Sequence, residues 1–466
     1  MKKKSIFIIM LLCMALVLSA CGGSEATITT PEGEEISVPK NVKFEAGKFN
    51  TDVSELTVAL AEGETEQLQF FTKLESADFT GSADIEALCA WAAENPHVDV
   101  LYTVTLPDGT VLDTKSRSAD LSAYSGEDVR LAAESLRLLP GLKSIELGTE
   151  RAGLSWEDIE VLQQTCPGVK LKYLFELYGK EVDLQNTQLN LRNVGVYDWY
   201  EGCTQLRQAL DHMPQLTYAD LDNAGVPSSE MEKLMEEYPH IEFVWRIWFG
   251  SDFNYSVRTD VEMILASKPS TGGYISAENS ADLKYCTKVK YLDLGHNGTL
   301  TDISFVEHMP ELEVAIIAMT GISDLSPFMS CPELEYLEMQ TTKITDLSPL
   351  AGLTKLRHIN AAAIPALSDI TPLYNITELE RLWIGGYSAV PREQFEEMQK
   401  RAPGCKICAE GLQDPTTGGW RTSMHPEGYM IADPRYILLR MQFNDYTNKS
   451  FSFYWNDPLY ENYTMK

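Results

Sequence analysis

Histidine and cysteine are the residues of this chain best suited to catalysis or metal binding. The seven histidines are scattered, and none stands in an HExxH motif or in a cluster with metal-ligand spacing. Cys405 and Cys408 form a CxxC pair, but they lie in a strand-like stretch where residues i and i+3 point to opposite faces. Because no second CxxC accompanies them, zinc binding is disfavoured, and we predict no metal site and no cofactor.

The motifs of the common enzyme classes are missing from the sequence. It contains no GxSxG elbow, no P-loop and no GxGxxG. With 68 acidic residues, paired carboxylates occur by chance and carry no information. We therefore predict that the protein is not an enzyme, and the alternative is a hydrolase whose pocket is assembled from distant residues.

Two columns of side chains suit binding better than catalysis. Tyr, Trp and Arg, the types enriched at binding hot spots, recur there at fixed places. The predicted ligand-binding residues are Tyr291, Asp293, Tyr336, Glu338, His358, Asn360, Arg381 and Trp383. They alternate with apolar residues, so we expect them to face solvent, opposite the core. An ordinary soluble face would carry charged and short polar residues instead.

These columns belong to a stretch that repeats about every 22 residues. Its units begin at Val289, Leu312, Leu334, Leu356 and Leu379, at successive offsets of 23, 22, 22 and 23 residues. Alternating apolar positions predict a short strand with one buried face. A Ser or Thr before Pro follows in most units, and we expect its hydroxyl to cap a short helical segment. One such coil cannot bury its apolar side alone, so the coils must stack as a solenoid.

The blocks Leu334-Glu-Tyr-Leu337-Glu-Met339 and Asp346-Leu-Ser-Pro-Leu350 resemble the short leucine-rich repeats of bacterial internalin-like proteins. The resemblance implies a parallel sheet whose concave side carries the two columns and binds a ligand. The asparagine of the family pattern is present only as Asn297, with Thr320, Thr342 and Ile364 in the matching places.

The N-terminus indicates an export signal. Three lysines precede thirteen uncharged residues, 6–18, which are too few to span a bilayer. Leu-Ser-Ala before Cys21 resembles a bacterial lipoprotein signal, which implies lipidation of Cys21 with acyl chains such as palmitate. Such a lipid would anchor the chain at the cell membrane, facing outside the cytoplasm. The alternative is an ordinary cleaved signal peptide.

Charge restricts the partners. Removing residues 1–20 deletes three lysines and no acid, so 38 basic residues become 35 against 68 acidic ones, a balance of −33. Such a surface repels nucleic acid. The predicted partner is an unknown protein or cell-surface polymer.

A longer period precedes the 22-residue coils. Short strands begin at Leu74, Leu142, Leu216 and Val289, at offsets of 68, 74 and 73 residues. Each of the first three is followed by a helix, a Pro and a long strand. We predict one continuous solenoid with hairpins budding from it, its short strands in a single parallel sheet. Two or three unrelated α/β domains are the alternative.

The predicted fold is α/β: a leucine-rich-repeat-like solenoid with longer βα-hairpin repeats on its N-terminal side and an aromatic C-terminal cap. Its predicted parts are the lipoprotein signal 1–21, a linker and leading strand 22–47, long-period repeats 48–288, leucine-rich repeats with a closing helix and strand 289–410, and the cap 411–466. Eleven aromatic residues crowd the cap segment. We expect them to cover the apolar end of the last coil, and the alternative is a platform for carbohydrate or peptide. The predicted function is that of a membrane-anchored, extracytoplasmic binding scaffold.

Overall fold

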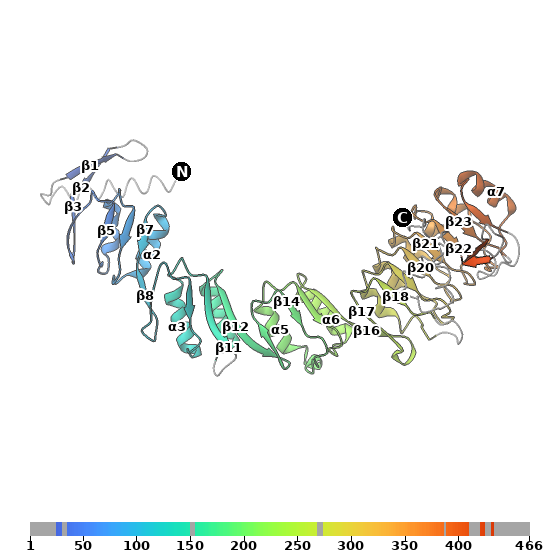
Figure 1. Ribbon diagram of the computed structural model, residues 1–466, viewed down its shortest axis with the longest axis horizontal. Helices are drawn as coiled ribbons and strands as arrows, with labels where there is room; N and C mark the ends of the chain where they lie inside the picture. Colours follow the sequence, from blue (N-terminus) through green and yellow to red (C-terminus); the bar gives the residue numbers. More distant parts are fainter. Residues whose placement is uncertain are drawn as a thin grey trace. The chain divides into compact units, whose positions relative to one another are not determined.

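The computed structural model describes residues 25–29, 35–149, 154–267, 274–385, 388–409, 420–424 and 430–432. They fall into two compact units, whose helices and strands are labelled in Figure 1. The first unit runs to Leu189 and includes Cys203–Leu216, and the second holds Asn190–Gly202 and the chain from Thr217 onward. The predicted signal with Cys21, and most of the predicted aromatic cap, lie outside the described residues.

The first unit contains two rounds of the long repeat, preceded by two antiparallel hairpins. Its elements are β1 (Glu25–Thr29), β2 (Glu35–Pro39), β3 (Asn41–Phe44), β4 (Gly47–Asn50), β5 (Glu55–Thr57), η1 (Glu64–Phe70), β6 (Ser76–Asp78), α2 (Ile85–Glu94), β7 (Asp99–Leu101), β8 (Thr103–Thr105), β9 (Val111–Asp113), β10 (Ser118–Asp120), α3 (Gly126–Leu136), β11 (Ser144–Thr149), α4 (Trp156–Thr165), β12 (Lys170–Leu177), β13 (Lys180–Asp183) and α5 (Thr204–Asp211). β14 (Gln188–Asn190) ends at the boundary between the units.

Two helices of the long repeat begin with a side-chain cap. Asp84 accepts a hydrogen bond from the amide of Ala87 at the start of α2, and Ser155 forms a capping box with Asp158 at the start of α4. In α6 (Ser228–Glu237), Pro227 takes the N-cap position and no side chain caps the helix.

The long strands change partner halfway along. Residues 170–174 of β12 pair in parallel with β11, and residues 174–177 pair antiparallel with β13. In the second unit, β16 (Glu242–Phe249) likewise pairs in parallel with β15 (Tyr218–Leu221) and then antiparallel with β17 (Tyr255–Arg258). Each round therefore ends in a hairpin.

This hairpin overturns the prediction of one continuous parallel sheet. β6, β11 and β15 lie in three different sheets, and none of them shares a sheet with β19 (Tyr291–Asp293). The reason is local: the strand on which the next round should stack continues into an antiparallel return strand, which occupies that sheet edge with the wrong direction. Repetition in sequence thus gives repeated small sheets.

The second unit ends in the predicted stack of short coils. Its further elements are η2 (Trp199–Glu201), η3 (Ser251–Phe253), β18 (Met263–Leu265), η4 (Ala281–Tyr285), η5 (Ser304–His308), β20 (Val314–Ile316), η6 (Ser326–Ser330), β21 (Tyr336–Glu338), η7 (Ser348–Leu350), β22 (His358–Asn360), η8 (Thr371–Asn375), β23 (Arg381–Trp383), α7 (Arg392–Arg401), β24 (Lys406–Cys408), β25 (Thr422–Met424) and β26 (Met430–Ala432).

Strands β18 to β24 form one parallel seven-stranded sheet in which neighbouring coils pair in register (Figure 1). The central residue of each repeat strand points into the core. These residues are Leu292, Ala315, Leu337, Ile359 and Leu382, all 0% exposed. The predicted leucine-rich-repeat solenoid is confirmed for this stretch, because each coil buries its apolar side only by stacking on its neighbours.

The turns of these coils are capped differently from our prediction. Asp324, Asp346 and Asp369 each accept a hydrogen bond from the backbone amide two residues later, at 2.8–2.9 Å. The Ser and Thr hydroxyls at these turns instead bond to the same aspartates, so the predicted hydroxyl caps are wrong. Each Asp is the first residue of an Asx turn, in which the carboxylate accepts a hydrogen bond from the backbone amide two residues later.

Threonine replaces the missing asparagine of the family pattern in two coils, and Ile364 stands at the matching position of a third. Asn297 Nδ2 donates to the carbonyl of Leu294 at 2.8 Å, and the hydroxyls of Thr320 and Thr342 donate to the carbonyls three residues before them at 2.7 Å. The two threonine coils therefore keep a buried side-chain bond to the backbone with a shorter side chain.

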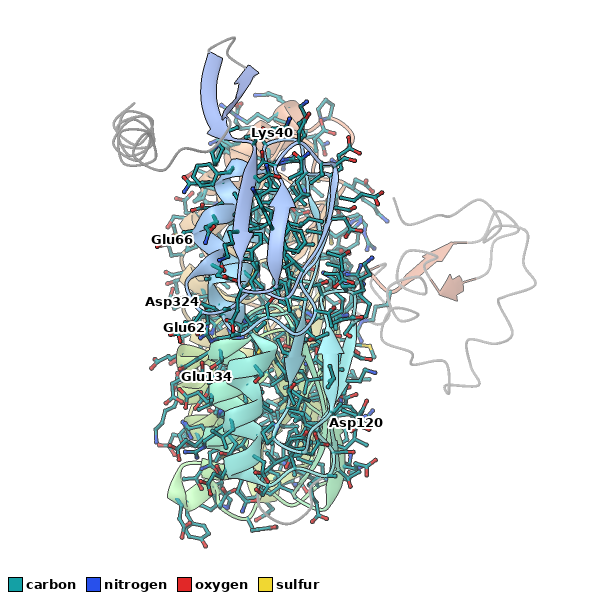
Figure 2. All side chains as sticks on the ribbon, turned by 90° about the vertical axis from the view of Figure 1, so that its left-hand side faces the viewer. Lys40, Glu62, Glu66, Asp120, Glu134 and Asp324 are labelled. Carbon is teal, nitrogen blue, oxygen red and sulfur yellow. The ribbon has the colours of Figure 1, made fainter. Side chains whose placement is uncertain are left out.

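Surface charge and cysteines follow the sequence reasoning. Glu62, Glu66, Asp120 and Glu134 are exposed on the first unit (Figure 2). Cys166 and Cys331 are buried free thiols, whereas Cys89 is a half-buried free thiol. In the part of the chain that the structure describes, no helix is long and apolar enough to cross a membrane.

Candidate binding face

The face of the seven-stranded sheet opposite the leucine core, called the concave face here, carries the two predicted columns. It is not open to solvent. Asp293, Tyr336, Glu338, Asn360, Arg381 and Trp383 are at most 4% exposed, and Tyr291 and His358 are half-buried. The prediction that these residues face solvent is therefore wrong for the six buried ones, and the role of all eight in ligand binding stays a prediction.

Trp420 packs on part of this face. It is 0% exposed and belongs to an apolar cluster with Val314, Ile316, Tyr336 and Trp383 on the sheet. Its ring centroid lies 5.5 Å from that of Tyr336 and 5.5 Å from that of Trp383, in tilted geometry. Tilted aromatic contacts of this kind stabilise beyond the area they bury. Trp420 thus packs on Tyr336, Arg381 and Trp383, which lie 84, 39 and 37 positions before it in the chain.

Glu338 is the polar centre of the contact. The indole Nε1 of Trp420 donates to Glu338 Oε1 at 2.7 Å, and Nη2 of Arg421 donates to Glu338 Oε2 at 2.9 Å. The hydroxyl of Tyr336 also donates to Oε1, and Gln340 Nε2 donates to Oε2 at 3.3 Å. The side chain of Glu338 is fully buried, whereas that of Arg421 is 24% exposed.

The ionised form of Glu338 is favoured in this setting. Burial alone would raise the pKa of the carboxyl, but the charge of Arg421 and the hydrogen bonds from Tyr336, Trp420 and Arg421 outweigh it and lower the pKa. Burial and the neighbouring carboxylate raise the pKa of Tyr336 well above its usual value, so its hydroxyl keeps the proton that it donates. A buried carboxylate is tolerated here because its oxygens are saturated with donors.

Arg381 holds the other side of the Trp420 ring. Its guanidinium lies 4.1 Å from the ring centroid, and Nη1 donates to the backbone carbonyl of Trp420 at 2.9 Å. Nε of the same side chain lies 3.2 Å from Nδ1 of His358. We call Tyr336, Glu338, Arg381 and Trp383 the Glu338 seat, and Trp420 with Arg421 the resident pair. The carboxylate of the seat accepts from the indole N–H and from the guanidinium of the resident pair. The aromatic rings of the seat pack on the indole ring.

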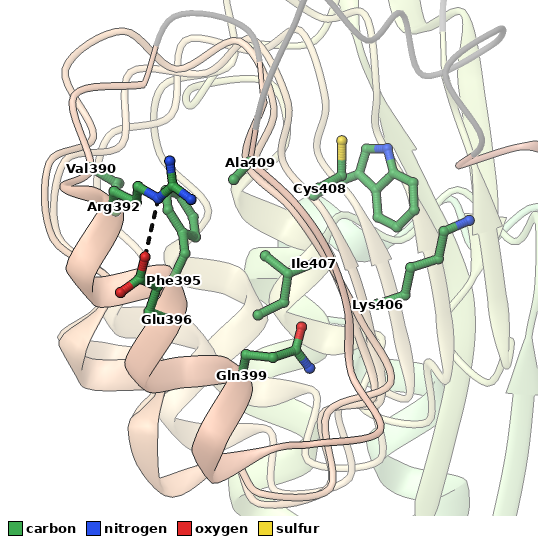
Figure 3. Close-up of a pocket in the computed structure, with 10 residues that line it drawn as sticks. Val390, Arg392, Phe395, Glu396, Gln399, Lys406, Ile407, Cys408 and Ala409 are labelled. Carbon is green, nitrogen blue, oxygen red and sulfur yellow. Dashed lines mark hydrogen bonds and ion pairs between the residues drawn. The ribbon is translucent and has the colours of Figure 1, made fainter.

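A separate pocket of about 820 Å³ lies beside the seat, between α7 and β24 (Figure 3). Arg392 and Glu396 pair across one turn of α7 at 3.1 Å, and Phe395 and Ile407 supply apolar walls. Lys406 and Trp383 also line the pocket, and Lys406 Nζ lies 5.1 Å from the ring centroid of Trp383. Within the described ranges, no group of histidine, cysteine and carboxylate side chains has the arrangement of a metal site.

Several solved structures are similar to this chain at low sequence identity. An internalin C2 of Listeria monocytogenes is 17% identical, with 35% of this chain and 81% of that chain covered and a TM-score of 0.27. An internalin F of the same organism is 15% identical over 80% of this chain and 87% of that one, with a TM-score of 0.26. A leucine-rich-repeat protein of Leptospira interrogans is 13% identical over 77% and 96%, with a TM-score of 0.28. No family model and no curated protein matches the chain.

The eight predicted residues come together on one face, as expected from their spacing. Sequence reasoning missed the resident pair as part of the same site. Of the eleven aromatic residues after Gly411, Trp420 alone belongs to the described residues, and it packs on β21 and β23. No local pattern in the sequence signals this contact, because the burial of Glu338, which creates its need for a cationic partner, is itself a result of the tertiary structure.

Tyr336 and Trp383 are buried, so replacing them by Ala is not a harmless surface substitution, since each removal would leave a cavity beneath Trp420. Variants that probe binding must therefore act on the resident pair or on the polar side chains of the face, with folding measured beside them.

Proposed function

We propose that the protein is a lipid-anchored, extracytoplasmic binding scaffold whose concave face binds a protein partner. The observation that carries this proposal is the occupied Glu338 seat, in which a Trp and an Arg share one buried carboxylate. Trp and Arg are the side chains that most often dominate protein interfaces, and they do so from desolvated pockets such as this one. A seat that holds two residues of polypeptide favours a protein partner over a polymer of other chemistry.

The proposed function predicts that capture of a partner depends on the seat being open. Lipid-free chain, residues 22–466, would be immobilised as the native form, as Trp420→Ala/Arg421→Ala, and as the latter with Glu338→Gln. The double variant should capture a surface protein at least about tenfold more tightly than the native form, and the added Glu338→Gln should remove this gain. Mass spectrometry and titration of the captured protein would measure both.

Arg401→Ala serves as the matched control, because Arg401 is 44% exposed on α7, outside the seat. It should capture no more than the native form. Equal capture by all four forms would show that the concave face is not the binding surface and would refute the proposed function.

The proposed anchor makes an independent prediction at Cys21. Cys21→Ser should move the protein from the membrane fraction into the medium, since no other segment of the mature chain carries the 20 or so apolar residues of a span. Fractionation followed by immunoblotting of the host cells measures the shift, with Cys89→Ser as a cysteine control that should stay membrane-bound. A Cys21→Ser protein retained uncleaved in the membrane would contradict the lipoprotein signal.

A further inference from the structure

Three buried polar atoms near the resident pair have no hydrogen-bond partner among the described residues. They are Gln340 Oε1, Asn360 Nδ2 and Trp383 Nε1, in residues that are 5%, 0% and 1% exposed. The other end of each amide is engaged: Gln340 Nε2 donates to Glu338, and Asn360 Oδ1 accepts from the amide of Ala362 at 3.1 Å. Burial of an unpaired polar atom raises the free energy of the state that buries it, so the resident pair leaves the face incompletely satisfied.

These atoms adjoin the Glu338 seat. Glu338, Asn360 and Trp383 are register partners on three neighbouring strands, so their side chains form one column on the same face. Gln340 touches Glu338 directly. The column thus offers two donors and one acceptor next to a carboxylate that already binds an indole and a guanidinium.

Two donors and one acceptor complement a peptide group. A carbonyl oxygen can accept from Asn360 Nδ2 or Trp383 Nε1, and a backbone N–H can donate to Gln340 Oε1. The formal net charge of the chain, −30, also favours approach by a basic segment over an acidic one. The face is therefore built for a polypeptide that supplies an aromatic ring, a cation and backbone polar groups together.

We propose that the concave face recognises an extended segment in which Trp is followed by Arg, and that Trp420–Arg421 is its resident ligand in cis. A partner protein carrying such a segment displaces the resident pair and also satisfies Gln340, Asn360 and Trp383. This proposal rests on the proposed function, since it names the chemistry of the partner for the same face. The resident pair then keeps the seat closed until that partner is present.

The test uses a labelled synthetic peptide with the sequence of residues 416–425, which includes Trp420 and Arg421. It would be titrated by fluorescence anisotropy against lipid-free chain in the native form and as Trp420→Ala/Arg421→Ala. The double variant should bind the peptide at least about tenfold more tightly than the native form, whose seat is filled in cis. Adding Glu338→Gln should reverse the gain, and a peptide with Ala in place of Trp and Arg should not bind.

Two further variants separate recognition from damage to the fold. Arg421→Ala alone keeps Trp420 and should give an intermediate affinity. Asn360→Ala, added to the double variant, should weaken peptide binding roughly threefold or more through loss of one donor. Hydrogen exchange must show native protection of Leu337 and Leu382 in every form compared, so that an unfolded sheet is not scored as an open seat.

The outcomes divide cleanly. Peptide binding that is equal in the native form and the double variant would overturn the resident-ligand proposal, as would binding that ignores Glu338→Gln. An Asn360→Ala form that binds as tightly as its parent would overturn the role of the polar column. If the double variant captures a surface protein but not the peptide, the Trp-Arg assignment fails while the proposed function stands. If it captures neither, both fail.

Discussion

Leu337→Ala is expected to lower the free energy of unfolding of the second unit by about 2–5 kcal/mol. Leu337 is 0% exposed at the centre of β21, with the inward residues Ala315 and Ile359 at the paired positions of its two neighbouring strands. Truncation removes buried methyl and methylene groups, and the stacked coils on both sides prevent the cavity from collapsing. Urea denaturation followed by circular dichroism, with hydrogen exchange to locate the effect, measures the loss.

Met329→Ala is the matched control for this prediction, because Met329 belongs to η6 of the preceding coil and is 66% exposed. Truncation of an exposed side chain should change stability by no more than about 0.5 kcal/mol. If Leu337→Ala and Met329→Ala had the same effect, the leucine column would not be the core of the solenoid.

Glu338→Ala should open the concave face. The substitution removes the acceptor of Trp420 Nε1, of Arg421 Nη2 and of the Tyr336 hydroxyl at once. Breaking a buried, hydrogen-bonded ion pair from one side typically costs about 3–5 kcal/mol. The resident pair can move into solvent, which reduces the loss in the free energy of unfolding. We therefore expect the full effect on the binding of the resident pair to the face, and a smaller effect on the stability of the solenoid beneath it. Trypsin cleavage after Arg421 and hydrogen exchange in β21–β23 report the opening.

Glu335→Ala is the matched control, because it removes another glutamate that lies three residues before Glu338. Burial and repulsion by Glu313 raise the pKa of Glu335, the reverse of the shift at Glu338, so its carboxylate does not stabilise the fold. Its removal should leave protease sensitivity at Arg421 unchanged. Equal sensitivity in the two variants would mean that Glu338 does not hold the resident pair.

Local pattern alone determined much of this protein. Patterns among neighbouring residues predict the 22-residue period, the inward leucines and the closing helix Arg392–Arg401. The coils must then stack, because a coil with one apolar side can bury that side only against its neighbours. The capping of α4 by Ser155 is equally local. The same spacing correctly brought Tyr336, Glu338, Arg381 and Trp383 to one face, since alternation in a strand fixes which side chains share a side.

Tertiary structure decided what that pattern could not specify. Whether β11 and β19 share a sheet depends on which strand takes each free edge, and in the long rounds the return strand of a hairpin takes it. Whether Glu338 meets water depends on Trp420 and Arg421, 82 and 83 positions away in the chain. Alternation says that a side chain leaves the core of its own coil, but it cannot say what else in the chain packs on it, because such long-range contacts leave no period in the sequence.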